Sequence, residues 1–384
     1  MQQKFEHKSL TILAICFCLT LNIWIAVQNR AAYGVDFNQF YSASRLVGTG
    51  QLYKWEALRK LEAENGVEVR TGRLPVVIYG YKLLGYFPYS TARIIWTAGG
   101  IAALMIFALA WPGASRSIMT TALACSIPAT LAVLFGQDIP LWLMFFAIAL
   151  LMLERKKPWV AGMVFSLCIC KFHLSLGIPV MLVAQKRWKT LIGGGVAFVV
   201  LISACFLIEG SSWPLAYKEM VQVTQFSPAY ESMPNLRGLT AGLPWPGVSE
   251  AILATVLLLL LWLQCRENED VSITGATAMA AGLTVAHHGL VADSVLLIPL
   301  TVLTITKQGT PSWLKAWAIV LLSPLTMWLI LAQRSHIWQL LIVGFVATSN
   351  VLSLVAQSAR RMLMVYQSVS QDGSPPMEAE VASE

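Results

Sequence analysis

Long apolar runs, separated by short polar stretches, make up most of the chain. Each run approaches the roughly 20 residues that an α-helix needs to cross about 30 Å of hydrocarbon. We count about twelve such runs, which cover residues 9–27, 92–111, 118–135, 139–153, 158–171, 173–185, 190–208, 249–264, 272–287, 291–306, 312–332 and 337–356. The pattern predicts an all-α integral membrane protein, a polytopic bundle of about twelve transmembrane helices.

Two places interrupt this regular alternation. The runs that end at Lys171 and start at Phe172 are short for full spans, which predicts a dip into the membrane there. A further apolar piece, at about 74–88, is broken by two glycines and a proline. It has the pattern of a short re-entrant or interfacial helix.

The composition agrees with a membrane protein. Hydrophobic residues make up 57% of the chain and charged residues 12%, and the mean hydropathy is +0.64. A soluble globular domain does not need so much apolar surface. We therefore exclude that class.

Basic residues crowd every second short loop and so predict the orientation. The positive-inside rule places these loops in the cytoplasm, and the clearest clusters are Arg155-Lys156-Lys157 and Arg360-Arg361. Both termini are then cytoplasmic, while two long loops, 28–91 and 209–248, face outward. The net charge of +7 lies mostly in this inner collar, so it does not indicate nucleic acid as a partner.

The domain organisation is simple. We expect one transmembrane domain over residues 1–360, including both outer loops, and a disordered cytoplasmic tail over 361–384, which is rich in serine, proline and glutamate. The seven cysteines lie in or at the ends of apolar runs. They therefore offer no disulfide framework in the outer loops.

The first outer loop contains two segments with helical spacing. One runs from Phe37 to Val47 and ends before two glycines, and the other contains Trp55, Leu58 and Leu61 among charged residues. Both patterns are typical of amphipathic helices in the membrane interface. Such helices either only anchor the loop or also frame a lipid-borne substrate, and the sequence leaves both open.

Several polar residues gather on the predicted outer side. Each has a plain structural interpretation: a turn, a helix cap, a lysine that extends to the interface, or an ordinary interfacial histidine. Together, a carboxylate, cations and histidines on one membrane face suit a lipid-phosphate substrate, because cations bind phosphate and a carboxylate accepts a hydroxyl proton. The residues are Asp36, Gln137, Asp138, Lys171, His173, Asn235, Arg237, His287, His288 and Asp293.

Missing motifs narrow the chemistry further. The chain has no phosphate-binding glycine loop of the Walker type, no His-Glu-x-x-His and no Gly-x-Ser-x-Gly. It also lacks an Asp-x-Asp pair to hold a metal on a nucleotide sugar. We therefore expect no soluble nucleotide donor, no metal and no other cofactor.

Four short motifs resemble glycosyltransferase family 87, over about residues 33–305. They are Asp36-Phe37 with Phe40-Tyr41-Ser42-Ala43 and Leu52-Tyr53; Gly136-Gln137; Ala161-Gly162 through Lys171; and His288 with Asp293, besides the piece Asn235-Leu236-Arg237-Gly238. The chain departs from the family pattern at Phe172 and His173, where proline and glutamine are usual, and at His287, which replaces a proline. These departures leave the sugar open.

This resemblance implies a membrane enzyme of the GT-C type. It would transfer one sugar from a polyprenyl-phosphate carrier to a lipid or glycan acceptor, with inversion, at the outer face of the cytoplasmic (inner) membrane. Mannose is the first expectation, and arabinose or another sugar is possible. Asp36 would be the base, and Lys171, Arg237 and His288 would stabilise the departing phosphate. The other expected substrate-binding residues are Tyr41, Gln137, His173, Asn235 and Asp293.

Two other classes stay open from the sequence. A transporter or lipid flippase is also polytopic and carries intramembrane charges, although transporters usually show two similar halves. A non-catalytic scaffold of an envelope-assembly complex is the third class. The unmatched long loop after the first apolar run favours an enzyme.

Overall fold

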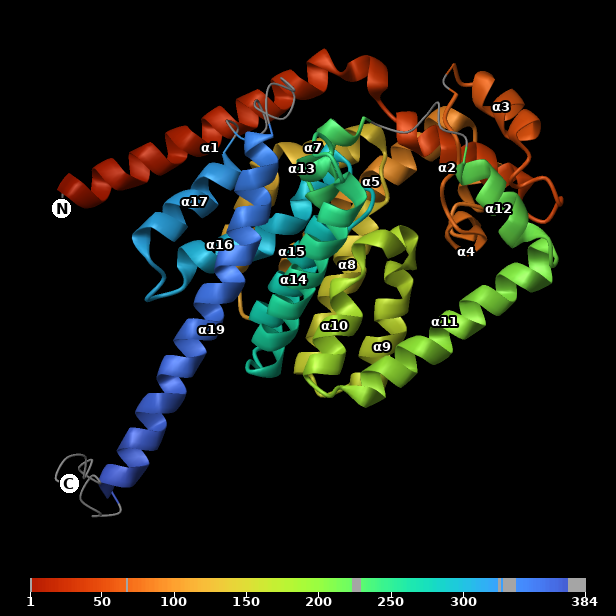
Figure 1. Cartoon of the computed structure of the whole chain (residues 1–384). Helices are drawn as coiled ribbons and strands as arrows, with labels where there is room; N and C mark the ends of the chain where they lie inside the picture. Colours follow the sequence, from red (N-terminus) through yellow and green to blue (C-terminus); the bar gives the residue numbers. More distant parts are fainter. Residues whose placement is uncertain (1, 67, 223–228, 324–325, 327–335, 372–384) are drawn as a thin grey trace.

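The computed structural model of the chain describes residues 2–66, 68–222, 229–323, 326 and 336–371 (Figure 1). Within these ranges every regular element is a helix, as predicted. The first part of the chain forms α1 (Gln2–Gln28), η1 (Arg30–Ala32), α2 (Val35–Leu46), α3 (Trp55–Ala63), α4 (Pro75–Tyr79), η2 (Leu84–Tyr86), α5 (Tyr89–Ala110), α6 (Arg116–Ala124) and α7 (Ile127–Phe135).

The middle of the chain continues the bundle and contains the second long loop. Its elements are α8 (Ile139–Glu154), α9 (Pro158–Ser166), η3 (Leu167–Leu174), α10 (Gly177–Ala184), α11 (Trp188–Glu209), α12 (Trp213–Val221), η5 (Tyr230–Ser232) and α13 (Leu236–Thr240). The last part forms α14 (Pro246–Arg266), α15 (Val271–Val285), η6 (Val291–Leu297), α16 (Ile298–Thr306), α17 (Ser312–Leu322) and α19 (Ile337–Gln371).

Four helices are long and apolar enough to cross a membrane. They are Tyr89–Ala110, Trp188–Glu209, Pro246–Arg266 and the part Ile337–Leu363 of α19. The number rises to six if each of two bent pairs, Ile12–Gln28 with Arg30–Leu46 and Arg116–Ala124 with Ile127–Phe135, is one span. The apolar helices confirm the membrane class, but the predicted count of about twelve spans is not confirmed.

The remaining predicted spans fall on shorter helices. Apolar helices such as Ile139–Glu154 and Val271–Val285 have 10–17 residues, fewer than a straight span needs. The predicted dip lies where η3 follows α9: Lys171 has φ −134° and ψ 63°, outside the helical range. The second half of the predicted span 312–332 lies mostly outside the described residues.

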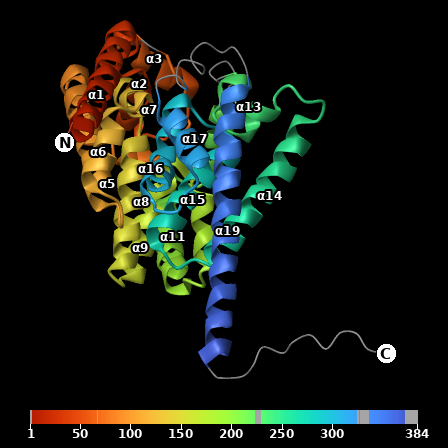
Figure 2. The same cartoon turned by 90° about the vertical axis from the view of Figure 1, so that its left-hand side faces the viewer.

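The C-terminal helix is longer than expected. Figures 1 and 2 show α19 running past the rest of the bundle, and it stays helical to Gln371. Residues 361–371, the first part of the tail that the sequence predicts to be disordered, continue this helix. No glycine or proline occurs between Gly344 and Gly373, so nothing in the sequence stops the helix there. Residues 372–384 lie outside the described residues.

The two long loops pack together at one end of the molecule (Figure 1). Buried side chains of α2, among them Phe37 and Phe40, form a hydrophobic cluster with Trp213 and Met220 of α12. A larger cluster fills the helical bundle, from α5 to α19. The loop cluster is therefore a small core of its own, and it carries the start of α2.

Both helices predicted in the first outer loop form, as α2 and α3, but α2 is not amphipathic in the expected way. Asn38, Gln39, Ser42 and Ser44 are all buried, as are its aromatic residues. Their polar groups find partners inside the protein: Asn38 donates to the carbonyl of Glu62 on α3. The polar face of α2 thus contacts α3 and the following segment, where the sequence predicted contact with water and headgroups.

Candidate active site

Two glycines bring α2 and α7 together. Gly34 precedes α2 with φ +76°, and its N–H donates to the Leu134 carbonyl over 2.9 Å. Gly136 ends α7 with φ +73°, and a Cβ there would lie 2.7 Å from Cβ of Phe37. Neither position accepts a side chain without strain or a clash. The contact places the first turn of α2 directly against the end of α7.

The end of α7 also aims Gln137. The N–H groups of Gly136 and Gln137 bond back to the carbonyls of Val133 and Ala132, the pattern of a Schellman cap. Gln137 is consequently the first residue beyond the helix, and its side-chain Nε2 donates to Oδ2 of Asp36 over 2.9 Å. Asp36 is not the cap of α2, because Gly34 occupies that position without a side-chain cap bond.

Lys171 lies next to the pair formed by Asp36 and Gln137, and it is 1% exposed. Its Nζ donates to Oδ1 of Asp293 over 2.5 Å and to Oε1 of Gln137 over 3.4 Å, and lies 3.7 Å from Oδ1 of Asp138. The side chain therefore does not extend to the membrane interface. It is a fixed buried cation that neutralises carboxylates from two other segments.

Asp138 has a second cationic partner, Arg73 of the first long loop. The guanidinium binds the carboxylate at two points, with Nε 2.6 Å from Oδ2 and Nη2 3.0 Å from Oδ1. Burial alone would lower the pKa of Arg73, but the Asp138 carboxylate raises that pKa above its ordinary value. The pair ties the first loop to the bundle and keeps Arg73 charged.

These groups line one cavity of about 850 Å³. Helix α2 contributes Asp36, Gln39 and Phe40, and the loop after α3 contributes the cations Arg70 and Arg73. Further lining side chains come from the turn after α7, η3, α12, the segment before α13, the turn after α15, and η6. They include Gln137, Lys171, Phe172, His173, Tyr217, Tyr230, Met233, His287, His288 and Asp293.

His287 and His288, in the turn after α15, differ in exposure. The His287 side chain is largely exposed, and its Nδ1 lies 3.4 Å from Oε1 of Glu250. His288 is half-buried, and its ring meets that of His173 edge to face at 5.8 Å. Burial lowers the pKa of His288 to about 4, with Lys171 and Arg73 acting in the same direction against Asp293. This lowered pKa favours the neutral imidazole in the cavity.

Six of the nine predicted site residues reach this cavity: Asp36, Gln137, Lys171, His173, His288 and Asp293. Asp293 also caps η6, where its Oδ2 accepts from the N–H of Leu290 over 2.8 Å. The plain structural interpretation of Asp293 as a helix cap therefore applies together with its bond to Lys171.

Three predicted residues do not line the cavity. Arg237 donates to Oε2 of Glu250 over 2.8 Å and lies over the ring of Tyr230. Asn235 caps α13 through Gly238 and donates to the Ala286 carbonyl, which holds the turn before the histidines. Tyr41 is buried and donates to the Phe87 carbonyl. In the structure these three side chains hold neighbouring segments in place, and their predicted contacts with substrate stay predictions.

Two cations that the sequence did not single out, Arg70 and Arg73, line the cavity instead. Both lie in the outer loop 28–91, on the predicted side of Asp36, and this was the only signal that could have found them. Their place depends on long-range contacts. Arg73 binds Asp138, and Arg70 donates to the Val221 carbonyl at the end of α12.

The arrangement can support proton abstraction next to a phosphate site. A carboxylate, held by one amide, faces a cavity that also presents two guanidinium groups and three imidazoles. Within the described residues, no group of three histidine, cysteine, aspartate or glutamate side chains has the geometry of a metal site.

Comparison with known protein families places this geometry in context. Residues 75–292, more than half of the chain, match the family model described as glycosyltransferase family 87. The match contains Gln137, Lys171 and His288, whereas Asp36 precedes it and Asp293 directly follows it. Neither the curated proteins nor the solved structures provide a match.

Proposed function

Because the chain belongs to glycosyltransferase family 87, we propose that this membrane glycosyltransferase takes its sugar from a polyprenyl-phosphate carrier. The acceptor is a lipid or a glycan, and the reaction takes place at the outer face of the cytoplasmic membrane. Mannose is the first candidate sugar. Family membership supports an enzyme over a transporter.

The observation that carries this proposal is the position of Asp36 in the cavity. Its carboxylate accepts one hydrogen bond, from Gln137, and shares the lining with Arg70, Arg73 and His288. The transfer of a sugar from a phosphate to a hydroxyl requires two groups: a base for the hydroxyl proton and a site that binds the phosphate. The cavity, about 850 Å³, has the size of a small-molecule site.

The chemical step follows from these roles. The acceptor hydroxyl oxygen attacks the anomeric carbon from the face opposite the phosphate, and its proton passes to the Asp36 carboxylate. The bond between the anomeric carbon and the phosphate oxygen breaks, and the electron pair leaves with polyprenyl phosphate. The product is inverted at the anomeric carbon, and the carrier phosphate gains one negative charge.

Arg70 and Arg73 are the groups that we assign to this developing charge. Guanidinium groups bind phosphate oxygens in a planar, two-point manner, and fixed cations stabilise charge that grows in the transition state. Lys171 acts behind them as a buried cation that holds Gln137, Asp138 and Asp293. Neutral His288 contributes a hydrogen bond to the phosphate or the sugar.

The test is a transfer assay with the purified full chain in lipid vesicles. A panel of radiolabelled polyprenyl-phosphate sugars, mannose and arabinose among them, is offered together with a membrane lipid extract as acceptor. We expect one sugar of the panel to appear in a new product, and the same label to be absent with Asp36→Asn. Transfer from a nucleotide sugar but from no polyprenyl-phosphate sugar would refute the proposed donor.

A further inference from the structure

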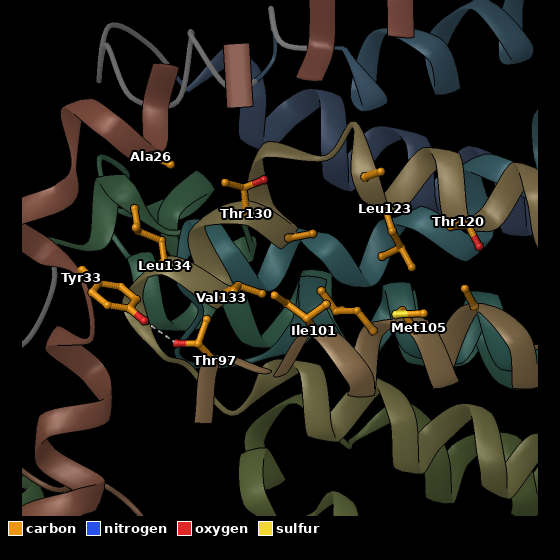
Figure 3. Close-up of a pocket in the computed structure, with 14 residues that line it drawn as sticks. Ala26, Tyr33, Thr97, Ile101, Met105, Thr120, Leu123, Thr130, Val133 and Leu134 are labelled. Carbon is orange, nitrogen blue, oxygen red and sulfur yellow. Dashed lines mark hydrogen bonds between the residues drawn. The ribbon is translucent and has the colours of Figure 1, made fainter. Parts of the chain in front are cut away.

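A second cavity, of about 420 Å³, lies between α5, α6, α7 and the end of α1 (Figure 3). Its lining is almost entirely apolar, with Leu123, Val133 and Leu134 on one side and Ile101 and Met105 on the other. The last two side chains are 48% and 56% exposed. The cavity is therefore a groove that opens at the outer surface of α5, which a bilayer surrounds if α5 is a span.

One end of this apolar groove is polar. The hydroxyl groups of Tyr33 and Thr97 bond to each other over 2.8 Å, as Figure 3 shows. Arg93 lies one turn before Thr97 on α5, and its carbonyl accepts from the Thr97 hydroxyl over 2.9 Å. Arg93, Thr97, Ile101 and Met105 recur at every fourth residue and so share one helix face, about 18 Å long.

The charge of Arg93 is not neutralised by a carboxylate. Its guanidinium lies 4.3 Å from the ring centroid of Tyr33 and 5.5 Å from that of Tyr89. Among the residues that the structure describes, no aspartate or glutamate oxygen lies within 4 Å of it. Its Nη1 donates to the Tyr33 carbonyl over 3.5 Å, and its buried Nε has no hydrogen-bond partner among the described residues. Arg93 does not itself line the groove, but its guanidinium lies over the ring of Tyr33, which does. A cation thus stands beside the polar end of a hydrocarbon-lined groove, and its complement is an anionic lipid.

We propose that this groove binds an anionic phospholipid of the surrounding bilayer. One acyl chain lies along Thr97, Ile101 and Met105, and the phosphate pairs with Arg93. The groove and the catalytic cavity have no lining residue in common. The stacked rings of Phe37, Tyr89 and Trp96 occupy the junction between α2 and α5. These two facts favour a bilayer lipid over the substrate of the catalytic cavity.

The site has a direct mechanical link to Asp36. The aliphatic part of Arg93 packs on Gly34, where a Cβ would lie 2.6 Å from Cδ of Arg93. Gly34 is the residue before α2, and Asp36 lies in the first turn of that helix. A phosphate that holds Arg93 therefore also steadies the start of α2. This link, which rests on the proposed function, makes anionic lipid an activator.

Lipid retention tests the binding site without any transfer assay. The purified full chain is reconstituted in nanodiscs with equal parts of phosphatidylglycerol and phosphatidylcholine, released into detergent, and analysed by native mass spectrometry. We expect the wild type to retain phosphatidylglycerol in preference, and Arg93→Gln to reduce that preference by about tenfold, the size of one charge-assisted contact. Arg59→Gln, on exposed α3, is the matched control and keeps the preference.

A second variant tests the groove itself. Ile101→Trp fills the opening at an exposed position, so it should fold normally and lower the retention of both lipids. Unchanged retention in Arg93→Gln and Ile101→Trp would overturn the proposal. Displacement of the retained phosphatidylglycerol by long-chain polyprenyl phosphate would also overturn it, since the groove would then belong to the carrier. Neither result bears on the proposed transfer reaction, which the transfer assay tests separately.

Discussion

The side-chain amide of Gln137 donates from Nε2 to Oδ2 of Asp36 over 2.9 Å, although 101 positions of the chain separate the two residues. The other end of the same amide, Oε1, accepts from Nζ of Lys171 over 3.4 Å. A lysine ammonium only donates, so it fixes which end of the amide faces Asp36. Within the described residues the other carboxylate oxygen of Asp36 has no hydrogen-bond partner, and we propose that it faces the ligand of the cavity.

Asp36→Asn should abolish transfer without unfolding the protein. Asparagine has the size of aspartate and can accept the Gln137 hydrogen bond through its own oxygen, but it cannot take a proton. We expect transfer to fall by about 10²-fold or more while the affinity for the polyprenyl-phosphate donor is kept. The measurements are initial transfer rates and donor binding in the same vesicles.

Glu64→Gln is a matched control for this variant. Glu64 lies in the same outer segment, where it pairs with Arg45 in an exposed salt bridge, and its substitution should leave transfer near the wild-type rate. Near-normal transfer by Asp36→Asn would show that this carboxylate is structural. Asp293 or His288 would then be the next candidates for the base.

Lys171→Gln should destabilise the protein. The family resemblance implied a lysine that stabilises the departing phosphate, whereas its surroundings show that Lys171 also supports the fold. The structure places it between Asp293 and Asp138 with 1% exposure. Removing one partner of a buried ion pair costs about 3–5 kcal/mol, because it leaves a buried charge without compensation. Thermal unfolding in detergent should show a clear loss of stability.

The double variant Lys171→Gln with Asp293→Asn separates pairing from packing. If the loss comes from the unpaired carboxylate, the double variant should be more stable than Lys171→Gln alone, with a coupling energy of about 0.5–3 kcal/mol. Strictly additive losses would show that the two side chains do not interact as the distance of 2.5 Å implies.

Arg70→Gln should weaken donor use, whereas Arg237→Gln should not. Arg70 lines the cavity, while Arg237 is held outside it by Glu250. A hydrogen bond to a charged group contributes about 1.5–3 kcal/mol, so we expect the KM for the donor to rise, or kcat/KM to fall, by roughly 10- to 150-fold. The transfer rate of each variant is measured as a function of donor concentration, with the acceptor in excess. A larger effect from Arg237 than from Arg70 would contradict the assignment of the phosphate site.

These contrasts show where sequence reasoning succeeds. The hydrophobic pattern predicted helices over most of the bundle, and the spacing from Phe37 to Val47 predicted α2 (Val35–Leu46) almost to the residue. A helical period is a local property, so the local sequence is enough to find it. The short motifs around Asp36, Gln137, Lys171 and His288 likewise identified residues that now line one cavity.

The same reasoning could not tell which polar groups point into the cavity. The predicted topology puts Arg237 and Arg73 on the same side of the membrane. Only the fold shows that Arg237 pairs with Glu250 and that Arg73 pairs with Asp138. The Arg73–Asp138 pair spans 65 positions, and no local pattern encodes such a contact. The predicted count of about twelve full spans is not confirmed, because several of the apolar runs fall on helices of 10–17 residues.

Glu62 should make stability depend on pH. Its side chain is buried on α3, where Oε2 accepts from the Val69 N–H and Oε1 has no partner. Burial raises the pKa of Glu62 from 4.5 to about 8. The folded state then holds the proton more tightly than the unfolded state, so this contribution to stability is full below pH 4.5 and is lost as the pH rises through about 8.

The unfolding temperature of the wild type should therefore fall as the pH rises from about 4.5 to about 8 and then level off, and Glu62→Gln should flatten this fall. Glu64→Gln, which removes an exposed carboxylate of the same loop, serves as the control and should keep the wild-type profile. A Glu62→Gln profile parallel to that of the wild type would show that Glu62 is not the titrating group.

Single-cysteine labelling should establish the orientation. In a cysteine-free background we expect cysteines at Asn65 and Ser232 to react with an impermeant reagent in intact cells, and cysteines at Ser115 and Arg155 to react only after permeabilisation. The reason is the positive-inside rule applied to the short loops. Labelling of position 65 only after permeabilisation would reverse the predicted orientation and move the proposed reaction to the cytoplasmic side.

The contact between Gly136 and Phe37 has a consequence for the state of the free enzyme before its substrates bind. Backbone atoms and a Cβ have no rotamers, so the spacing that this contact sets between Asp36 and Gln137 is complete as soon as the chain folds. No ligand is needed to order the proposed base. Substrate binding therefore carries no free-energy cost for ordering Asp36, which is the advantage of a preorganised site.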